Sequence, residues 1–118
     1  MRTVYCIAFR DDEFLMVFNP KRGGWEMPGG KVEKGESDLE AIRREFAEET
    51  GMTLRALCCV ETEEGSVFAG EVGEPAGEGE MDWCLFDALP EQLAFPSCEY
   101  LPLIEWARRA CAESRRPA

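Results

Sequence analysis

The sequence has no histidine, and this absence excludes several kinds of chemistry at once. Serine–histidine triads, cysteine–histidine dyads and most zinc sites depend on an imidazole. The sequence also lacks a C-x-x-C pair, although it has six cysteines, of which Cys58 and Cys59 are adjacent and poorly placed to bridge. We therefore expect reduced, mostly buried thiols and a cytoplasmic protein, with a disulfide framework or a zinc site as the less favoured interpretation.

Long apolar segments and basic residues are scarce as well. No apolar run approaches the roughly 20 residues that span a bilayer, and charged Arg10 and Asp11 come too early for a signal peptide. Thirteen lysines and arginines stand against 24 aspartates and glutamates, which gives a net charge of −11. This charge repels nucleic-acid backbones and anionic lipid, so we expect no duplex nucleic acid and no membrane as partner. A polyphosphate ligand requires divalent cations that neutralise the carboxylates.

The remaining composition is that of an ordinary globular protein. The 118 residues fit one domain over residues 1–118, because two cores would each be too small at this length. Hydrophobic residues make up 45% and charged residues 31% of the chain, which excludes disorder throughout. We expect a single folded unit that acts as a monomer or homodimer.

Strands are predicted where β-branched and aromatic residues lie between glycine-, proline- or acid-rich turns. The predicted strands are residues 3–9 and 14–18, which form a hairpin, a short piece at 25–27, and residues 54–60, 67–72 and 82–86. Residues 28–30 are expected to bend the chain, and residues 73–79 to form a flexible acidic loop. An amphipathic helix is predicted at residues 100–112, with Pro102 in its first turn, followed by a tail at 115–118.

An earlier helix is predicted at residues 38–50. Ser37 and Glu40 have the Ser-x-x-Glu pattern of a capping box, and Gly51 supplies a left-handed stop. Apolar residues recur at helical spacing and form a core-facing stripe of Leu39, Ile42 and Phe46.

Three glutamates, Glu45, Glu48 and Glu49, lie at i, i+3 and i+4 on this helix and therefore share one face. Unbridged like charges at this spacing cost about 0.2–0.5 kcal/mol per pair, so the helix gains from a cation such as Mg²⁺, which prefers oxygen ligands. The alternative is a solvated acidic face on an acidic protein. The face borders the apolar stripe, with Glu49 nearest the core, and this favours a metal site in a cleft.

Together with the preceding glycines, the helix carries a long motif. Residues 30–52 match G-x5-E-x7-R-E-U-x-E-E-x-G-U, where U is an apolar residue. The specified residues are Gly30, Glu36, Arg44, Glu45, Phe46, Glu48, Glu49, Gly51 and Met52. On this motif the chain resembles the Nudix hydrolases, and residues 25–29 and 83–90 also resemble segments of that family.

The resemblance implies an α/β/α sandwich, in which a mixed β-sheet lies between the motif helix and the C-terminal helix. It also implies hydrolysis of a phosphoanhydride in a nucleotide by water, with Mg²⁺ or Mn²⁺ ions, and this chemistry needs no histidine. Carried over by position, the metal ligands are Gly29, through its carbonyl, Glu45, Glu48 and Glu49. Glu45 is either a ligand or the base that activates water. Arg44 and Glu36 support these carboxylates through charge-assisted bonds, unless Arg44 forms only a surface ion pair.

The resemblance also implies a further acidic residue from a later loop. Glu80 is the first choice as base or additional ligand, with Glu78 and Asp82 as alternatives, while a solvated acidic turn explains all three equally well.

The bases and phosphates of a substrate need their own contacts. Arg22 and Lys31 are candidates to meet phosphates, although they serve equally well as solubilising charges. Trp25 or Phe95 is a candidate to stack on a base, with core packing as the favoured alternative.

Within the family, the segment from Trp25 to Lys31 and the pair Phe95-Pro96 look most like the MutT-type nucleoside triphosphate pyrophosphohydrolases. This predicts cleavage of a (d)NTP, with 8-oxo-dGTP as one candidate, to a nucleoside monophosphate and pyrophosphate. The chain departs from that pattern at Ser97, where a second proline is usual, and at Glu99, where a purine-reading asparagine is usual. An ADP-ribose, dinucleotide or capped-RNA pyrophosphohydrolase is the first alternative, because loops select the substrate. A non-catalytic Nudix-fold binding module is the second, although such modules usually lose the glutamates that this chain keeps.

Overall fold

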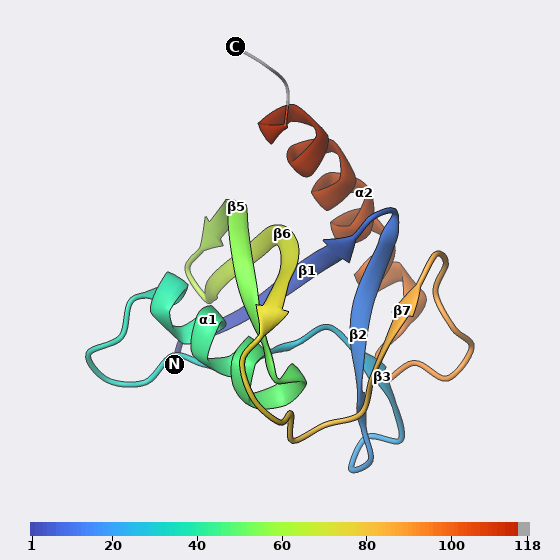
Figure 1. Cartoon of the computed structure of the whole chain (residues 1–118), viewed down its shortest axis with the longest axis horizontal. Helices are drawn as coiled ribbons and strands as arrows, with labels where there is room; N and C mark the ends of the chain where they lie inside the picture. The colour runs from blue at the N-terminus through green and yellow to red at the C-terminus, as the bar shows by residue number, and fades with distance from the viewer. Residues whose placement is uncertain (116–118) are drawn as a thin grey trace.

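The computed structural model describes residues 1–115, which form seven strands and two helices (Figure 1). The elements in chain order are β1 (Thr3–Arg10), β2 (Glu13–Asn19), β3 (Gly24–Glu26), β4 (Gly29–Lys31), α1 (Asp38–Thr50), β5 (Met52–Thr62), β6 (Gly65–Pro75), β7 (Trp83–Phe86) and α2 (Ser97–Ser114). Residues 116–118, most of the predicted tail, lie outside the described residues. Arg115 belongs to the described part, where it caps α2 and pairs with Glu71 at 2.7 Å.

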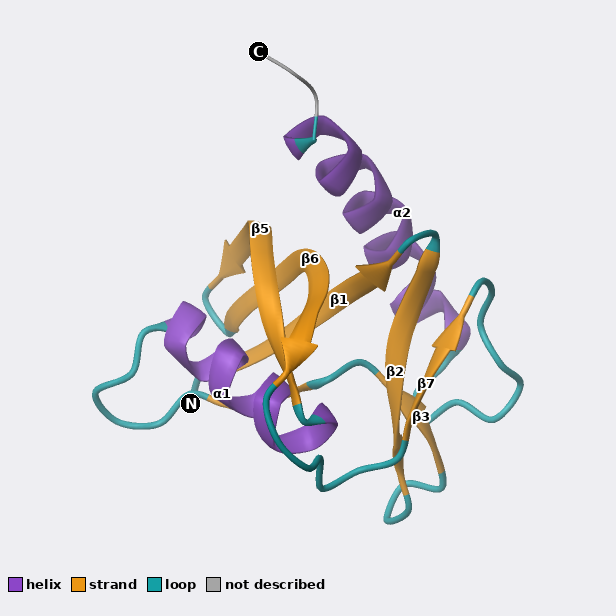
Figure 2. Ribbon diagram, in the orientation of Figure 1, coloured by secondary structure: helices purple, strands orange, loops and turns teal. Residues whose placement is uncertain are grey.

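The strands form one mixed sheet in the order β3-β2-β1-β6-β5 (Figure 2). The predicted β1–β2 hairpin is confirmed as an antiparallel pair, whereas β1 and β6 run parallel. Strands β1 and β2 pair only near their turn, so β4 occupies the remaining edge of β1, while β7 pairs with β2. This arrangement brings the two glycines of β4 alongside the central strand of the sheet.

The side chains of β1 alternate between two cores, as the period of a strand requires. Val4, Cys6 and Ala8 pack in one core with the buried face of α1, whereas Ile7 and Phe9 pack in the other with α2. The two helices therefore cover opposite faces of the mixed sheet, which confirms the expected α/β/α sandwich.

Helix α1 begins and ends where the sequence predicts. Ser37 Oγ accepts from the Glu40 N–H at 3.1 Å, and Glu40 Oε1 accepts from the Ser37 N–H at 3.0 Å, so the capping box is complete. Gly51 ends the helix in the left-handed region at φ 76°. Two stripe residues, Ile42 and Phe46, are fully buried, and Leu39 packs against the same core while partly buried.

Several predicted boundaries differ from the structure. Residues 28–30 were expected to bend the chain, but strand β4 begins within them at Gly29 and pairs with β1. The absence of a side chain at Gly29 allows this pairing, because a Cβ there would meet the Val4 carbonyl. Strands β5 and β6 are each longer than predicted, because they stay paired up to the two-residue turn at 63–64 that joins them. They also pair at the ends away from this turn, so β6 includes Gly73, which was expected to lie in a loop.

Helix α2 starts three residues earlier than predicted. Pro96 precedes it with φ −57°, its carbonyl accepts from the Glu99 N–H at 2.9 Å, and the Tyr100 hydroxyl donates to the Trp25 carbonyl at 3.1 Å. These contacts hold a first turn that helical periodicity alone does not reveal, and they place Pro102 beyond it. Neither helix of the described residues combines the length and apolarity needed to cross a membrane.

The expectation of mostly buried cysteines is only partly met. Cys6 and Cys111 are buried, and burial raises the pKa of both thiols. Cys59 is exposed because β5 is an edge strand, and Cys98 is exposed in the first turn of α2. An apolar sequence neighbourhood therefore did not distinguish core positions from an edge strand or a helix start.

Candidate active site

Three glutamates of α1 stand on the side of the helix that faces β4. Glu45 has 18% of its side chain exposed and Glu48 has 46%, while Glu49 is partly buried, so the three range from largely enclosed to open. Helix α1 packs against both β1 and β4, which fixes the distance between this face and the glycines of β4. The acidic face therefore lies against backbone and is not surrounded by solvent.

Glu49 reaches furthest toward the sheet, as its place beside the apolar stripe predicts. Its Oε1 accepts a hydrogen bond from the Gly29 N–H at 3.0 Å. Burial raises the pKa of Glu49 to about 8; the Gly29 hydrogen bond opposes this shift, and the charges of Glu45, Glu26 and Glu48 add to it. A carboxylate in this environment gains strongly from a nearby cation.

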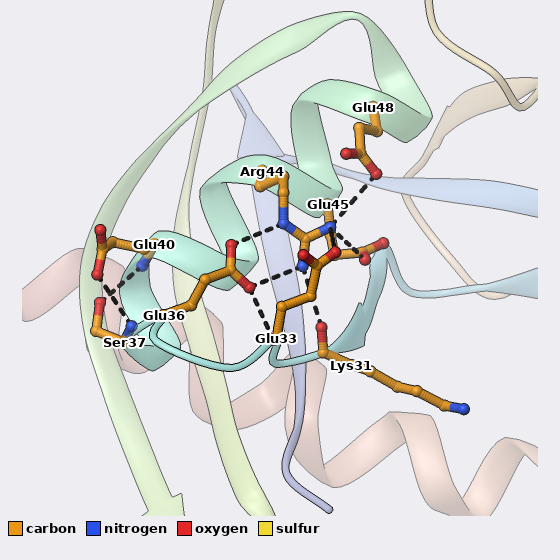
Figure 3. A network of polar contacts seen from close by, with 8 residues as sticks. All are labelled: Lys31, Glu33, Glu36, Ser37, Glu40, Arg44, Glu45 and Glu48. Carbon is orange, nitrogen blue, oxygen red and sulfur yellow. Dashed lines mark hydrogen bonds and ion pairs between the residues drawn. The ribbon is translucent and has the colours of Figure 1, made fainter.

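Arg44 is the centre of the polar network next to these carboxylates (Figure 3). Its guanidinium binds Glu36 in a bidentate manner, with Nε to Oε2 at 2.7 Å and Nη2 to Oε1 at 2.9 Å. Its Nη1 donates to Glu45 at 2.8 Å and to Glu48 at 3.4 Å, and Nη2 donates to the Lys31 carbonyl at 3.1 Å. Only 24% of the Arg44 side chain is exposed. Its partners lie on β4, at Glu36 and on α1, so its contacts go beyond a single ion pair at the surface.

Glu36 is the best-anchored carboxylate of the network. The hydrogen bonds from Arg44, followed by the hydrogen bond from the Glu33 N–H at 2.9 Å, lower the pKa of Glu36 to about 2. It therefore stays ionised at neutral pH and holds one edge of the guanidinium, while the other edge faces Glu45 and Glu48. These contacts place Glu36 and Arg44 beside the carboxylates of α1, and their supporting role stays a prediction.

Gly30 lies where the Glu45 side chain approaches β4 most closely. A Cβ at position 30 would lie 2.5 Å from the carboxyl carbon of Glu45 and 2.6 Å from its Oε2. Any other residue there would push the Glu45 side chain away or open the contact between β4 and α1. The first glycine of the motif thus has a direct steric explanation.

The segment from Ala76 to Met81 closes the C-terminal end of α1. The N–H groups of Ala76, Glu80 and Met81 donate to the carbonyls of Gly51, Glu48 and Glu49 at 2.7, 2.8 and 3.1 Å. These are carbonyls that a helix end leaves without an intrahelical partner. The docking brings the Glu80 backbone next to Glu48, which supports Glu80 over Glu78 and Asp82, although its role stays a prediction.

The candidate substrate contacts do not all lie together. Trp25 packs edge-on against Phe18 and Phe86, with ring centroids 5.4 and 5.1 Å apart, and belongs to the periphery of the α2 core. The Lys31 side chain points away from the Arg44 network (Figure 3). Arg22 lies over the ring of Phe95 at 5.2 Å. Their contacts with a substrate stay predictions.

The structure also shows a cavity that the sequence did not reveal. Its volume is about 220 Å³, and its lining residues include Tyr5, Glu26, Phe95, Glu99, Tyr100 and Leu103. They come from β1, β3 and α2 and from the loop before α2, so no local pattern groups them. The sequence named two of these residues separately, Phe95 as a candidate to stack on a base and Glu99 where a purine-reading asparagine is usual.

The donor set of the helix suits a hard divalent cation, because it consists of oxygen atoms only. Within residues 1–115, no three carboxylates or thiols already converge closely enough to hold an ion. Arg44 engages Glu45 and Glu48, while Glu49 turns to the Gly29 N–H. The buried, like-charged surroundings of Glu49 fit a cation, and the ligand set of Gly29 and these three glutamates stays a prediction.

Comparison with known proteins yields one family. The family model of the NUDIX domain matches residues 1–111. An uncharacterized Nudix hydrolase of Bacillus subtilis, YvcI, is 45% identical over 53 residues, which are 45% of this chain and 34% of that protein. The mouse 8-oxo-dGDP phosphatase NUDT18 is 39% identical over 56 residues, 45% of this chain and 17% of that protein. The chain therefore spans only a minor part of the curated relatives that it matches.

Solved structures agree with this family. A MutT structure, from work on the Aliivibrio salmonicida and Vibrio cholerae proteins, covers 90% of this chain and 94% of its own, with a TM-score of 0.58 and 28% identity. A UDP-X diphosphatase covers 92% of this chain and 63% of its own, with a TM-score of 0.69 and 23% identity, and it demonstrates likeness of fold alone.

Proposed function

The chain belongs to the NUDIX domain family, and on this basis we propose that it is a metal-dependent pyrophosphohydrolase acting on nucleoside triphosphates. The products are a nucleoside monophosphate and pyrophosphate, and the substrates include (d)NTPs, with 8-oxo-dGTP among the candidates. The name of one relative, a putative 8-oxo-dGTP diphosphatase of Mycobacterium tuberculosis that is 51% identical over 35 residues, supports this class of substrate. The mouse 8-oxo-dGDP phosphatase supports an oxidised guanine nucleotide, as a diphosphate. The proposal includes one domain over residues 1–118, action as a monomer or homodimer, and a cytoplasmic setting.

One observation carries the proposal: three glutamates of a single helix face lie against the glycine strand β4, and one arginine holds their outer edge. Glu49 contacts Gly29, and Arg44 contacts Glu45 and Glu48. A solvated acidic face would not account for a partly buried Glu49 on the Gly29 N–H or for a Glu45 carboxylate that lies directly against Gly30. Such an arrangement costs stability unless positive charge is supplied there.

The reaction follows from what these groups can hold. Mg²⁺ or Mn²⁺, when bound by Gly29, Glu45, Glu48 and Glu49, supplies charge stabilisation for the phosphates and a more acidic water. A water oxygen forms a new bond to phosphorus as the bridging P–O bond breaks, and the leaving phosphate takes the electron pair. Glu45 or Glu80 accepts the proton of that water. Arg44, anchored by Glu36, keeps the carboxylates on the correct side of the helix.

A nucleotide panel tests the proposal. Purified protein is incubated with each dNTP, 8-oxo-dGTP, ADP-ribose, a dinucleoside polyphosphate and a capped RNA, with Mg²⁺ or Mn²⁺, in ¹⁸O-labelled water. We expect triphosphates to give pyrophosphate and a nucleoside monophosphate, with the label in one of the two products. Turnover of ADP-ribose alone contradicts the MutT-type assignment. Absence of any hydrolysis product from every nucleotide at every metal concentration contradicts an enzyme and favours a binding module.

A further inference from the structure

The loop between β4 and α1 places a further carboxylate beside Arg44. The Glu36 N–H donates to the Glu33 carbonyl at 3.0 Å, and Gly35 lies in the left-handed region at φ 87°, so residues 33–36 form a tight turn. Glu36 Oε1 also accepts from the Glu33 N–H at 2.9 Å. The carboxylate that anchors Arg44 therefore anchors the backbone of Glu33 as well.

The side chain of Glu33 is held much less firmly than its backbone. It is 66% exposed, and its Oε1 lies 3.5 Å from Nη1 of Arg44 (Figure 3). Among the described residues, this is the longest of the four ion pairs that Arg44 makes. The same Nη1 donates to Glu45 at 2.8 Å and to Glu48 at 3.4 Å. Glu33 differs from these two partners because it lies outside α1 and outside the expected metal ligands.

Nη1 of Arg44 and a divalent cation compete for the same oxygen atoms. Glu45 and Glu48 are both expected to bind the ion, and both accept from Nη1 in this structure. A cation on these carboxylates takes lone pairs that serve Nη1 and repels the positive charge of the guanidinium. Arg44 cannot move far, because Glu36 and the Lys31 carbonyl hold its Nε and Nη2. Nη1 therefore needs another acceptor close by.

We propose that Glu33 is a positioning residue, which accepts the hydrogen bond of Arg44 Nη1 when a divalent cation binds Glu45 and Glu48. From 3.5 Å, its Oε1 needs to move by only about half an ångström to reach an ordinary N–H···O distance. This exchange of partners frees the two ligands and keeps the charge of the guanidinium paired. Glu33 itself touches neither the ion nor the substrate. The inference rests on the proposed function for the presence of the ion.

Two substitutions separate the contact from the charge. Glu33→Gln keeps the length of the side chain and removes its charge, whereas Glu33→Asp keeps the charge and withdraws it by one carbon–carbon bond. Mn²⁺ is titrated into the whole chain without nucleotide, and the free ion is measured by electron paramagnetic resonance. We expect both variants to raise the Kd for Mn²⁺ by about three- to tenfold, less than for a buried partner because Glu33 is exposed. Glu63→Gln removes the same charge from an exposed turn and should keep the wild-type Kd.

The NMR signals of the Arg44 guanidinium provide a readout that a merely structural role would not change. Mg²⁺ is titrated into ¹⁵N-labelled protein without nucleotide. In the wild type the ion should shift the Nη signals of Arg44 and leave the group hindered in rotation. In both Glu33 variants the same signals should broaden and exchange faster with water.

The outcomes distinguish this proposal from the proposed function. A wild-type Kd in Glu33→Gln, a wild-type Kd in Glu33→Asp, or Arg44 signals that respond to Mg²⁺ alike in all three proteins overturns the role of Glu33 alone. The expected changes without hydrolysis of any nucleotide support Glu33 and contradict the enzyme. Equal binding of Mn²⁺ by the wild type and Glu48→Gln, or no binding by either, contradicts the metal site and the role of Glu33 together.

Discussion

Arg44 and its neighbours set the electrostatics of the candidate active site at the scale of single residues. One guanidinium faces the carboxylates of Glu33, Glu36, Glu45 and Glu48 within 4 Å, so it leaves most of their negative charge uncompensated. Glu49 adds a further carboxylate on the buried side. Divalent cations are the simplest source of the missing positive charge, since the ligands are oxygen atoms.

Replacement of Glu48 by glutamine should lower turnover by at least about 100-fold, on the scale of removing one preorganised electrostatic group. The side chain of Glu48 is 46% exposed, against 18% for Glu45, so the substitution should leave the fold intact. Steady-state kinetics with the best substrate of the panel provide the measurement. Glu63→Gln, in the exposed turn between β5 and β6, is the control and should keep the parental rate. Near-parental turnover in Glu48→Gln would remove Glu48 from the metal site.

Asp38, the first residue of α1, should contribute to stability in a pH-dependent manner. Hydrogen bonds from Arg2 and then from Ser66 lower its pKa below the ordinary value of 3.8. A lowered pKa means that the ionised group stabilises the fold above its unfolded pKa, and that this contribution disappears as pH falls through the folded pKa. Asp38→Asn should therefore cost about 1 kcal/mol near neutral pH, at the upper end for partly solvated ion pairs, and progressively less in acid.

Urea unfolding of the wild type and Asp38→Asn at a series of pH values measures this difference. Asp87→Asn, at an exposed position after β7, is the control for removing one negative charge from an acidic protein. A cost that stays constant from neutral pH into acid would contradict the assignment of the effect to the ionised carboxylate.

At the scale of elements, α1 could be predicted from the sequence to the residue. Its start is specified by side chains that lie next to it in the sequence, Ser37 and Glu40, and its end by Gly51. Strand β4 could not be predicted, because what makes it a strand is a partner, β1, that lies about 25 residues earlier. The start of α2 depends in the same way on the distant contact between Tyr100 and Trp25.

The two helix starts offer a matched pair of substitutions. Ser37→Ala removes the side-chain cap of α1 and should lower the free energy of unfolding by about 1 kcal/mol. Ser97→Ala, at the start of α2, should change it by less than about 0.5 kcal/mol, because α2 has no side-chain cap there. Chemical denaturation of the wild type and both variants measures these changes in the free energy of unfolding. Equal costs at the two positions would mean that the Ser37 hydrogen bond contributes nothing specific.

At the scale of the whole molecule, the sheet brings together what the sequence separates. The motif of residues 30–52 was visible because its members share one helix and the loop before it. The cavity was not, since Tyr5, Glu26 and Glu99 meet only when β1, β3 and α2 pack. The family resemblance therefore predicted the fold and the expected chemistry and singled out Phe95 and Glu99, whereas their grouping with Tyr5 and Glu26 around one cavity became apparent only from the tertiary structure.

The net charge of −11 and the partly buried Glu49 together predict that magnesium stabilises the folded protein. An ion that binds only the folded state at 100 times its Kd adds about 2.7 kcal/mol to the free energy of unfolding, and this should raise Tm by several degrees for a chain of this size. EDTA should reverse the shift. Sodium chloride at matched ionic strength should reproduce only the part of the Tm shift that comes from general screening of acidic residues.

In thermal unfolding, Glu48→Gln should lose most of the magnesium effect and Glu63→Gln should keep it. If both variants shift as the wild type does, the ions act on the overall charge and the helix face of α1 holds no specific site.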